Sequence, residues 1–394
     1  MTDARTKKIG FGKRLLTAAA SLVMLATCAV TAMPAHAENG TVDGGTFTFS
    51  KYLVMNQDAN VPNVDFEFEI APGQAVDSDG NNPAIKAGIG SPSVRKVSFT
   101  AADTQSAKNG KPTDTEESGV SSGYKYATKT VTFDLSNVTF SAPGIYRYII
   151  KEKASTASGI ANDQTPTRTL DAYVSYVKDE DTQLLTNQLK VEYVMYSGTL
   201  TVNTGLNTGK SDNFTNSYAT QNLTLAKEVT GNQGDRDKYF EFKVNITSAT
   251  PGTVYTVDVT TDAEAKPSVD GVVKTNQATL TADDDGNVVN AVYYLKDGQS
   301  IVIKGLTENT NYNITETDYS TDGYTTTNTD NTAGGKTTGD QTMGDTAHTV
   351  TFTNHKEGTV PTGILLDVAP YIVLVALVGV GLIALLATKK RRSR

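Results

Sequence analysis

Val64-Asp65-Phe66-Glu67-Phe68-Glu69-Ile70 alternates apolar and charged residues without a break, and Thr46-Phe47-Thr48-Phe49-Ser50 alternates in the same way. Successive side chains of a strand point to opposite faces, so both stretches predict strands with one face in a core. Similar short stretches, rich in Thr, Val, Tyr and Phe, are separated by Gly, Asn and Asp clusters. Between the two ends of the chain no segment has a long helical period. The sequence therefore predicts an all-β fold, with sandwiches favoured over barrels.

The same series of residues occurs twice along the chain. The stretches and their counterparts are Phe49-Ser50-Lys51 and Leu225-Ala226-Lys227, Phe66-Glu67-Phe68 and Phe240-Glu241-Phe242, Tyr148-Ile149-Ile150-Lys151-Glu152 and Tyr312-Asn313-Ile314-Thr315-Glu316, and Phe214-Thr215-Asn216 and Phe352-Thr353-Asn354. Each half thus carries Lys on its first strand, then Glu, and Asn on its last strand. We expect two domains, residues 38–219 and 220–358.

Strand alternation puts all six of these polar residues on apolar faces; Lys51, for example, shares its face with Phe47 and Phe49. An unpaired buried charge is costly, so the repeated set needs a reason. One reason is an ordinary buried ion pair with an amide neighbour. The other is a self-formed bond between the lysine amine and the asparagine amide. Burial lowers a lysine pKa and raises a glutamate pKa, so a neutral amine attacks the amide while the acid moves protons and ammonia leaves.

The first 37 residues predict a cleaved signal peptide. Basic residues precede an apolar run that ends near Val30, and Ala35-His36-Ala37 is a small-x-small cleavage pattern. The apolar run is short for a membrane span. A lipoprotein acylated at Cys28 is the alternative, although Thr27 is a poor residue before such a cysteine. Cys28 is the only cysteine, so the exported chain has no disulfides.

The other end of the chain predicts a membrane span with a basic tail. Residues 368–387 form a largely apolar run, long enough for a transmembrane helix, and five Lys or Arg residues follow. Val360-Pro361-Thr362-Gly363 lies just before the run. This order resembles the cell-wall sorting signal that sortases cut between Thr and Gly, here Thr362 and Gly363. The commonest motif, Leu-Pro-x-Thr-Gly, has one more residue, and a plain single-pass membrane protein is the alternative.

Charge and composition exclude several functions. The chain carries −8, and residues 1–37 and 363–394 each contribute +4, which leaves −16 for residues 38–362. This charge argues against nucleic acids and anionic membranes as partners. Asp77-Ser78-Asp79-Gly80 and Asp283-Asp284-Asp285-Gly286 lack the final Glu of a calcium loop and predict turns. With only His348 and His355 beyond the signal peptide, we expect no metal site, no cofactor and no enzyme. Residues 320–345 predict a long exposed loop.

The chain resembles the T-antigen, or FctA-type, backbone pilins of sortase-assembled Gram-positive pili. The matching stretches are Phe49-Ser50-Lys51-Tyr52-Leu53, Val61-Pro62-Asn63-Val64-Asp65-Phe66, Pro143-Gly144-Ile145-Tyr146, and Val360-Pro361-Thr362-Gly363 followed by Val368-Ala369-Pro370-Tyr371-Ile372. The resemblance implies two tandem immunoglobulin-like β-sandwich domains, each with an isopeptide bond. The implied bonds are Lys51–Asn216, assisted by Glu152, and Lys227–Asn354, assisted by Glu316.

The resemblance also implies a major pilus shaft subunit that supports surface adhesion. Sortase joins Thr362 of one subunit to a lysine of the next, and the finished polymer is attached to peptidoglycan on the cell surface. Minor tip or base pilins are possible further partners. The linking lysine lies shortly before the closing strand of the first domain, which indicates Lys210 in a Gly-flanked polar stretch. Lys190 and Lys178 are rivals, and the Tyr-Pro-Lys-Asn motif of other pilins is absent. A monomeric wall-anchored adhesin is the alternative function, and a surface hydrolase is disfavoured because no catalytic constellation is present.

Overall fold

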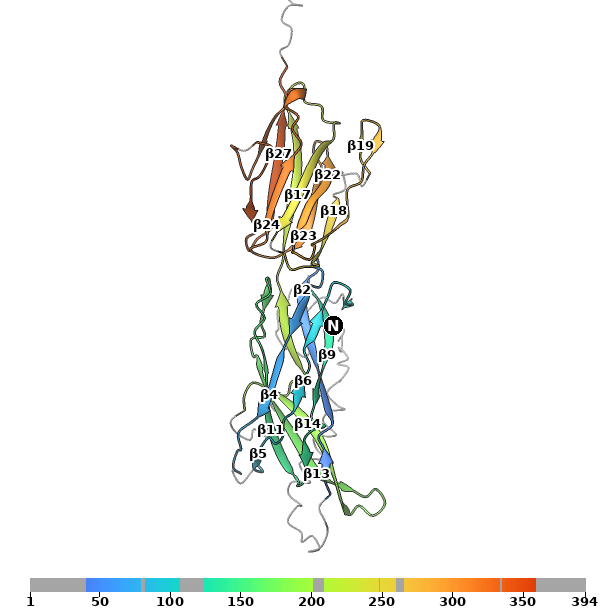
Figure 1. The fold of residues 1–394 in the computed structure, drawn as a ribbon, viewed down its shortest axis with the longest axis vertical. Coiled ribbons are helices and arrows are strands. Elements are labelled where there is room, and N and C mark those ends of the chain that lie inside the picture. The colour runs from blue at the N-terminus through green and yellow to red at the C-terminus, as the bar shows by residue number, and fades with distance from the viewer. Residues whose placement is uncertain are drawn as a thin grey trace, which may run out of the picture.

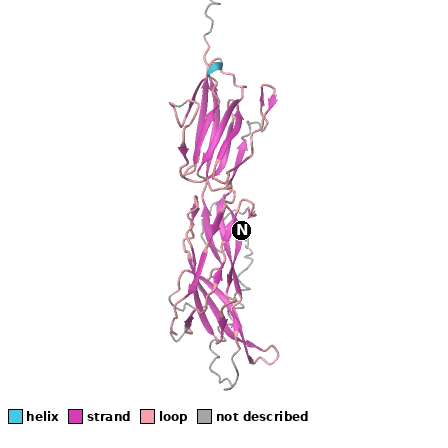
Figure 2. Ribbon diagram, in the orientation of Figure 1, coloured by secondary structure: helices cyan, strands magenta, loops and turns pink. Residues whose placement is uncertain are grey.

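The described part of the chain is an all-β structure, as Figure 2 shows. The computed structural model describes residues 40–78, 82–106, 124–200, 209–247, 249–259, 266–333 and 335–358. In these ranges the only helix is a 3₁₀ turn, η1 (Ser320–Asp322), and no helix there could cross a bilayer. The all-β prediction is therefore confirmed. The predicted signal peptide and sorting signal lie outside the described residues.

The first half of the chain forms two sheets that face each other. One sheet runs in the order β12 (Ile160–Ala161), β15 (Asn213–Tyr218), β2 (Thr46–Asn56), β9 (Tyr124–Asp134) and β6 (Ser93–Val94), with β8 (Gln105–Ser106) also on β9. The other runs in the order β14 (Leu185–Ser197), β13 (Thr167–Lys178), β11 (Gly144–Glu152) and β4 (Phe68–Pro72), with β5 (Ile85–Ala87) also on β11. Two short pairs accompany them, β1 (Val42–Asp43) with β10 (Thr139–Phe140) and β3 (Val64–Phe66) with β7 (Val97–Phe99).

The second half repeats this arrangement with fewer strands in the second sheet. Its first sheet runs in the order β21 (Thr279–Thr281), β18 (Val254–Val259), β23 (Ser300–Leu306), β16 (Gln221–Thr230), β27 (His348–His355) and β25 (Thr325–Asn328). Its second sheet runs in the order β22 (Val288–Leu295), β17 (Phe240–Thr247), β24 (Asn311–Glu316) and β26 (Gln341–Thr342). A small hairpin, β19 (Ser268–Val269) with β20 (Val272–Val273), lies apart from both sheets.

In each half the first long strand lies parallel to the last one. On β2 and β15, Lys51 is paired with Phe214, and on β16 and β27, Lys227 is paired with Phe352. The asparagine of each half lies two residues after that phenylalanine, on the same face of the strand. The repeated stretches of the sequence therefore occupy equivalent places in two similar frameworks.

Two separate hydrophobic cores hold the two halves, which Figure 1 shows end to end along one long axis. Aromatic rings dominate the first core, where Phe49 stacks on Phe133 at 5.1 Å between ring centroids. The junction between the halves is polar. Among its hydrogen bonds are those from Lys304 Nζ to Asp58 Oδ1 (3.0 Å), from Asn60 Nδ2 to Val254 O (2.8 Å), from Asn63 Nδ2 to Pro251 O (2.9 Å) and from Ser158 Oγ to Thr307 Oγ1 (2.9 Å).

The segment 320–345 differs from the predicted long exposed loop. It contains η1 and the strands β25 and β26, and the side chain of Asn328 within it is buried. Asn328 Nδ2 donates hydrogen bonds to the carbonyls of Gly335 (2.7 Å) and Thr337 (3.0 Å). Its Oδ1 accepts hydrogen bonds from the amides of Asp330 and Asn331. One buried amide therefore gives this Thr- and Gly-rich segment a fixed shape. The Asp283–Gly286 stretch forms a turn between β21 and β22, as predicted.

Candidate functional site

A buried cluster of three polar side chains lies in the first core. Lys51 comes from β2, Asn216 from the neighbouring strand β15, and Glu152 from β11 in the facing sheet. Lys51 Nζ lies 2.5 Å from Asn216 Oδ1 and 2.8 Å from Glu152 Oε1. The amine also lies over the ring of Phe66, 4.4 Å from its centroid. An amine, a carboxylic acid and a carboxamide are therefore in contact in a nonpolar pocket.

The second core contains the same set of residues. Lys227 Nζ lies 3.1 Å from Glu316 Oε1 and over the ring of Phe240, 4.3 Å from its centroid. Here Asn354 Nδ2 donates a 2.9 Å hydrogen bond to Glu316 Oε1, and Lys227 Nζ donates a 3.4 Å hydrogen bond to the carbonyl of Phe352. The structure thus brings together the three predicted residues of each half. Their chemical role stays a prediction.

Burial shifts these ionisable groups toward their neutral forms. Each of the six side chains belongs to a residue that is 3% exposed or less. Loss of hydration lowers the pKa of Lys51 to about 8 and that of Lys227 to about 8, although the neighbouring carboxylates oppose the shift. The same loss of hydration raises the pKa of Glu152 and of Glu316, against the opposing effect of the lysines. Burial thus favours the neutral amine and the neutral acid in both clusters.

Several buried polar atoms of the two clusters have no hydrogen-bond partner among the described residues. In the first cluster they are Glu152 Oε2 and Asn216 Nδ2, and in the second Glu316 Oε2 and Asn354 Oδ1. A buried polar atom without a partner costs roughly 1–3 kcal/mol. Such atoms are uncommon in folded proteins, and each one calls for an explanation. Here they are the carboxyl and carboxamide atoms that a condensation between lysine and asparagine would use.

One further group contacts the first cluster. The backbone N–H of Asp163 donates a 3.2 Å hydrogen bond to Asn216 Oδ1. Asp163 lies between β12 and β13, in a segment that no alternating pattern marks. Because the donor is a backbone amide, which almost every residue has, the sequence offers no signal for it.

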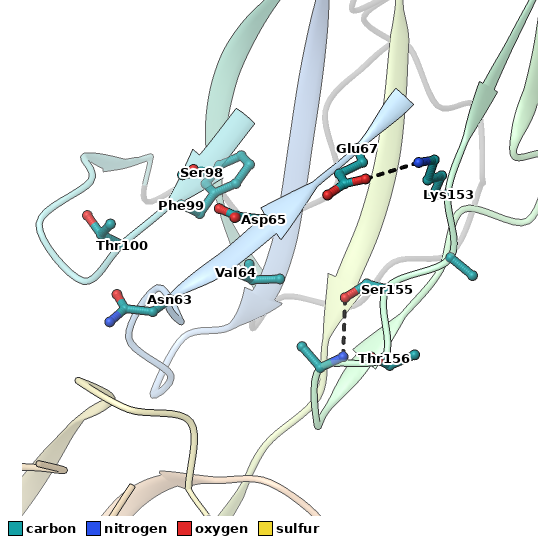
Figure 3. Close-up of a pocket in the computed structure, with 12 residues that line it drawn as sticks. Asn63, Val64, Asp65, Glu67, Ser98, Phe99, Thr100, Lys153, Ser155 and Thr156 are labelled. Carbon is teal, nitrogen blue, oxygen red and sulfur yellow. Dashed lines mark hydrogen bonds and ion pairs between the residues drawn. The ribbon is translucent and has the colours of Figure 1, made fainter. Parts of the chain in front are cut away.

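Two hollows border this region. A pocket of about 320 Å³ has Glu152, Asn162 and Asp163 in its lining, so the first cluster lies next to a route to solvent. A wider cleft of about 670 Å³ is drawn in Figure 3. Its charged lining residues are paired, Lys153 with Glu67 at 3.2 Å and Asp65 with Lys96 at 2.5 Å. With neither histidine nor cysteine in that lining, the cleft offers no nucleophile–base pair of the usual kind.

Lys210 is exposed at the edge of the first half. Its backbone forms an isolated bridge with Tyr196, and the amide of Ser197 donates a 2.7 Å hydrogen bond to the carbonyl of Gly209. The rival Lys190 is paired with Glu192 at 3.0 Å, whereas Lys178 is exposed at the end of β13. Lys178 and Lys210 are thus both exposed on a paired backbone, and of the two Lys210 is the one that lies just before β15. Thr362 and Gly363 lie outside the described residues.

The two histidines beyond the predicted signal peptide take part in ordinary polar contacts. His348 Nε2 lies 2.7 Å from Asp330 Oδ1, and His355 Nδ1 lies 2.9 Å from Thr230 Oγ1. Within the ranges that the structure describes, no group of three or more His, Cys, Asp or Glu side chains is arranged to hold a metal ion.

The chain thus consists of two consecutive β-units, and each holds a buried Lys–Glu–Asn cluster with the lysine on the first long strand and the asparagine on the last. Known proteins of this architecture match the chain. Residues 47–219 match the family model of the Spy0128-like isopeptide containing domain, and residues 221–356 match a domain of unknown function. The chain is 30% identical to a pilin of Streptococcus pyogenes serotype M1 over 382 residues, which cover 94% of this chain and 96% of that protein.

The chain therefore belongs to the pilin family of that streptococcal protein. The crystal structure of the major pilin from Streptococcus pyogenes superposes with a TM-score of 0.51 at 27% identity, covering 80% of this chain and all of that one. A shorter similarity, 34% identity over 148 residues, links 38% of this chain to 18% of the pilus tip adhesin Cpa of Streptococcus pyogenes. These relationships support a pilus subunit with an extracellular location and other pilus subunits as partners.

Proposed function

We propose that this chain is the major shaft subunit of a sortase-assembled pilus, and that each of its two immunoglobulin-like domains is closed by a self-formed isopeptide bond. The observation that carries the proposal is the 2.5 Å contact between Lys51 Nζ and Asn216 Oδ1 beside the buried carboxyl group of Glu152. The domains are residues 38–219 and 220–358. The first bond joins Lys51 to Asn216, and the second joins Lys227 to Asn354.

The bond forms by attack of the neutral lysine amine on the carboxamide carbon of asparagine. The Nζ–Cγ bond forms and the Cγ–Nδ2 bond breaks. Glu152 in the first domain and Glu316 in the second take a proton from the attacking amine and deliver one to the leaving nitrogen, which departs as ammonia. Because the fold holds the groups in contact, effective concentration replaces a separate enzyme.

Intact mass spectrometry tests the bonds. Residues 38–362 should have a mass lower than the sequence mass by two ammonias. The Glu152→Ala and Glu316→Ala variants should each regain one ammonia, because each lacks the proton carrier of one bond. Glu67→Ala changes an exposed glutamate of the same half and serves as the control that should retain both bonds. A wild-type mass equal to the plain sequence mass would refute the isopeptide part of the proposal.

The ends of the chain supply the assembly chemistry. Residues 1–37 act as a signal peptide that directs export and is then removed. The span 368–387 with its basic tail retains the chain at the membrane until sortase acts. Sortase cuts between Thr362 and Gly363 and transfers the Thr362 acyl group to the amine of Lys210 on the next subunit. The last transfer attaches the fibre to peptidoglycan. The exposure of Lys210 supports its role as the acceptor.

A monomeric wall-anchored adhesin is the second candidate, because part of the chain is similar to a pilus tip adhesin. Wall extracts separate the two functions. A polymerised shaft subunit gives a ladder of covalent multimers that Lys210→Ala abolishes and Lys190→Ala leaves intact. A single wall-linked species in the wild type would favour the adhesin.

A further inference from the structure

Two donors point at the carboxamide oxygen of Asn216 in the first cluster. Lys51 Nζ approaches Oδ1 at 2.5 Å, and the backbone N–H of Asp163 approaches the same atom at 3.2 Å. Both groups donate hydrogen bonds, so the atom between them has to be the oxygen of the amide and not its NH₂ group. The orientation of the asparagine is therefore determined by its surroundings, with Nδ2 left as the leaving group.

Negative charge develops on this oxygen when the amine attacks. The Nζ atom becomes part of the new bond, and the carboxyl group of Glu152 is occupied with the proton that travels to Nδ2. Among the hydrogen-bond donors that the structure gives Oδ1, the N–H of Asp163 is the one that remains unchanged through the reaction. Resting on the proposed isopeptide chemistry, we propose that the backbone N–H of Asp163 is the oxyanion donor of the first bond, and that the Asp163–Arg168 ion pair positions it.

The side chain of Asp163 fixes its own amide relative to Asn216. Its Oδ2 accepts hydrogen bonds from the backbone N–H of Thr215 (2.9 Å) and from Arg168 Nη2 (2.9 Å), and its Oδ1 accepts one from the N–H of Thr165 (2.7 Å). Thr215 directly precedes Asn216, so the carboxylate ties the Asp163 segment to the strand that carries the reacting amide.

Arg168, the ion-pair partner of Asp163, also contacts β15. It is buried with its guanidinium over the ring of Phe214, 4.3 Å from the centroid, and its Nε donates a 3.1 Å hydrogen bond to the carbonyl of Asn213. Asp163 and Arg168 therefore form a buried ion pair that holds β15 at Thr215 and at Asn213, just before Asn216. A surface pair would be too weakly held for this purpose, whereas the side chains of this pair are only 8% and 6% exposed.

The second cluster has no equivalent donor among the described residues. Asn354 Oδ1 is without a hydrogen-bond partner there, and Asn354 Nδ2 instead donates to Glu316. The two bonds of one chain thus differ in this group, so the second bond is an internal control for the first.

Timed bond formation tests the proposal. The chain is made by cell-free translation, quenched in acid at intervals and digested, and the Lys51–Asn216 and Lys227–Asn354 cross-linked peptides are quantified by mass spectrometry. Replacing Asp163 with its α-hydroxy acid removes the N–H and keeps the side chain. We expect the first bond to form roughly a hundredfold more slowly in this ester variant, with the second bond unchanged. Circular dichroism on undigested, unquenched samples of both chains verifies folding.

Side-chain variants test the positioning part. Asp163→Ala frees the amide from β15 and should slow the first bond by about tenfold or more. Asp163→Asn keeps one oxygen, which can accept the hydrogen bonds of Thr215 and Arg168 but not that of Thr165 as well, and should slow the first bond less than Asp163→Ala does. An ester variant that forms the first bond as fast as the wild type would overturn the oxyanion role. A wild-type chain that never forms the first bond would overturn both this proposal and the proposed isopeptide bond. A wild-type bond that forms equally fast in the ester variant would overturn this proposal alone.

Discussion

A lysine amine without exposed surface is costly unless a neighbouring group neutralises its charge or a reaction removes it. Lys227 has a neighbour for each case. Glu316, 3.1 Å away, can neutralise its charge, and Asn354, which donates a hydrogen bond to the same carboxylate, is the proposed reaction partner. Glu316→Leu fills the space of the glutamate but leaves the amine without a carboxylate to balance its charge. The double variant Lys227→Met/Glu316→Leu removes the charge as well. Breaking a buried ion pair costs about 3–5 kcal/mol, whereas replacing both partners with apolar residues is often neutral. We therefore expect the double variant to be roughly 3 kcal/mol more stable than Glu316→Leu.

Hydrogen exchange of the amides in β16 and β27 measures this difference within one half of the molecule. Asn354 loses its carboxylate acceptor in both variants, so that loss cancels. Intact masses confirm that neither variant carries the second bond. Equal protection of the two variants would mean that Lys227 finds another partner or reaches water.

The six cluster residues could be predicted from the sequence because strand alternation decides which side chains are buried. Lys51 and Asn216 share faces with phenylalanines that the sequence shows directly. Asp163 could not be found in this way, since its role depends on a loop conformation and on a backbone N–H, whereas Arg168 lies on β13 and shares its buried face with Leu170 and Ala172. Whether the lysine and asparagine react is a question of distance and protonation, which the alternating pattern does not contain.

At the level of elements, the repeat indicates that the two halves are built alike, but it does not predict that the first and last strands of each half pair in parallel. The segment 320–345 did not follow from composition either. Its Thr, Gly and Asp residues are typical of an exposed loop. The buried side chain of Asn328 instead gives the segment a defined conformation, because its four hydrogen bonds to the backbone take the place of hydrogen bonds between strands. Side-chain to backbone bonds of this kind have little periodicity, so pattern analysis misses them.

Asn328→Ala should therefore loosen the segment without unfolding the second half. Two carbonyls and two amides lose their partner, at a cost of about 1–3 kcal/mol for the segment if water reaches part of them. We expect faster hydrogen exchange from Thr329 to Thr338, with β16 and β17 unchanged. Thr332→Ala, at an exposed position of the same segment, is the control. Unaltered exchange in Asn328→Ala would show that the turn is held by other contacts.

For the whole molecule, the two proposed bonds determine how force passes along a fibre. They close loops of 165 residues (216 − 51) and 127 residues (354 − 227). By analogy with disulfides of the same loop length, each bond would add roughly 5 kcal/mol by restricting the unfolded chain. Both proposed bonds would connect adjacent parallel strands, so the covalent path would run from Lys51 to Asn216, through the junction to Lys227, and on to Asn354. With both bonds formed, we expect load applied to the two ends to bypass the sheets.

Single-molecule pulling on residues 38–362 tests this path. The wild type should extend only by the short flanking segments, because neither loop is able to open while its bond is intact. Glu152→Ala should add one step on the order of 500 Å, since 165 residues at about 3.3–3.6 Å each are released when the first half unfolds. Glu316→Ala should add a shorter step, in proportion to its 127 residues. Similar steps in the wild type and in Glu152→Ala would mean that the sheets, and not the bonds, carry the load.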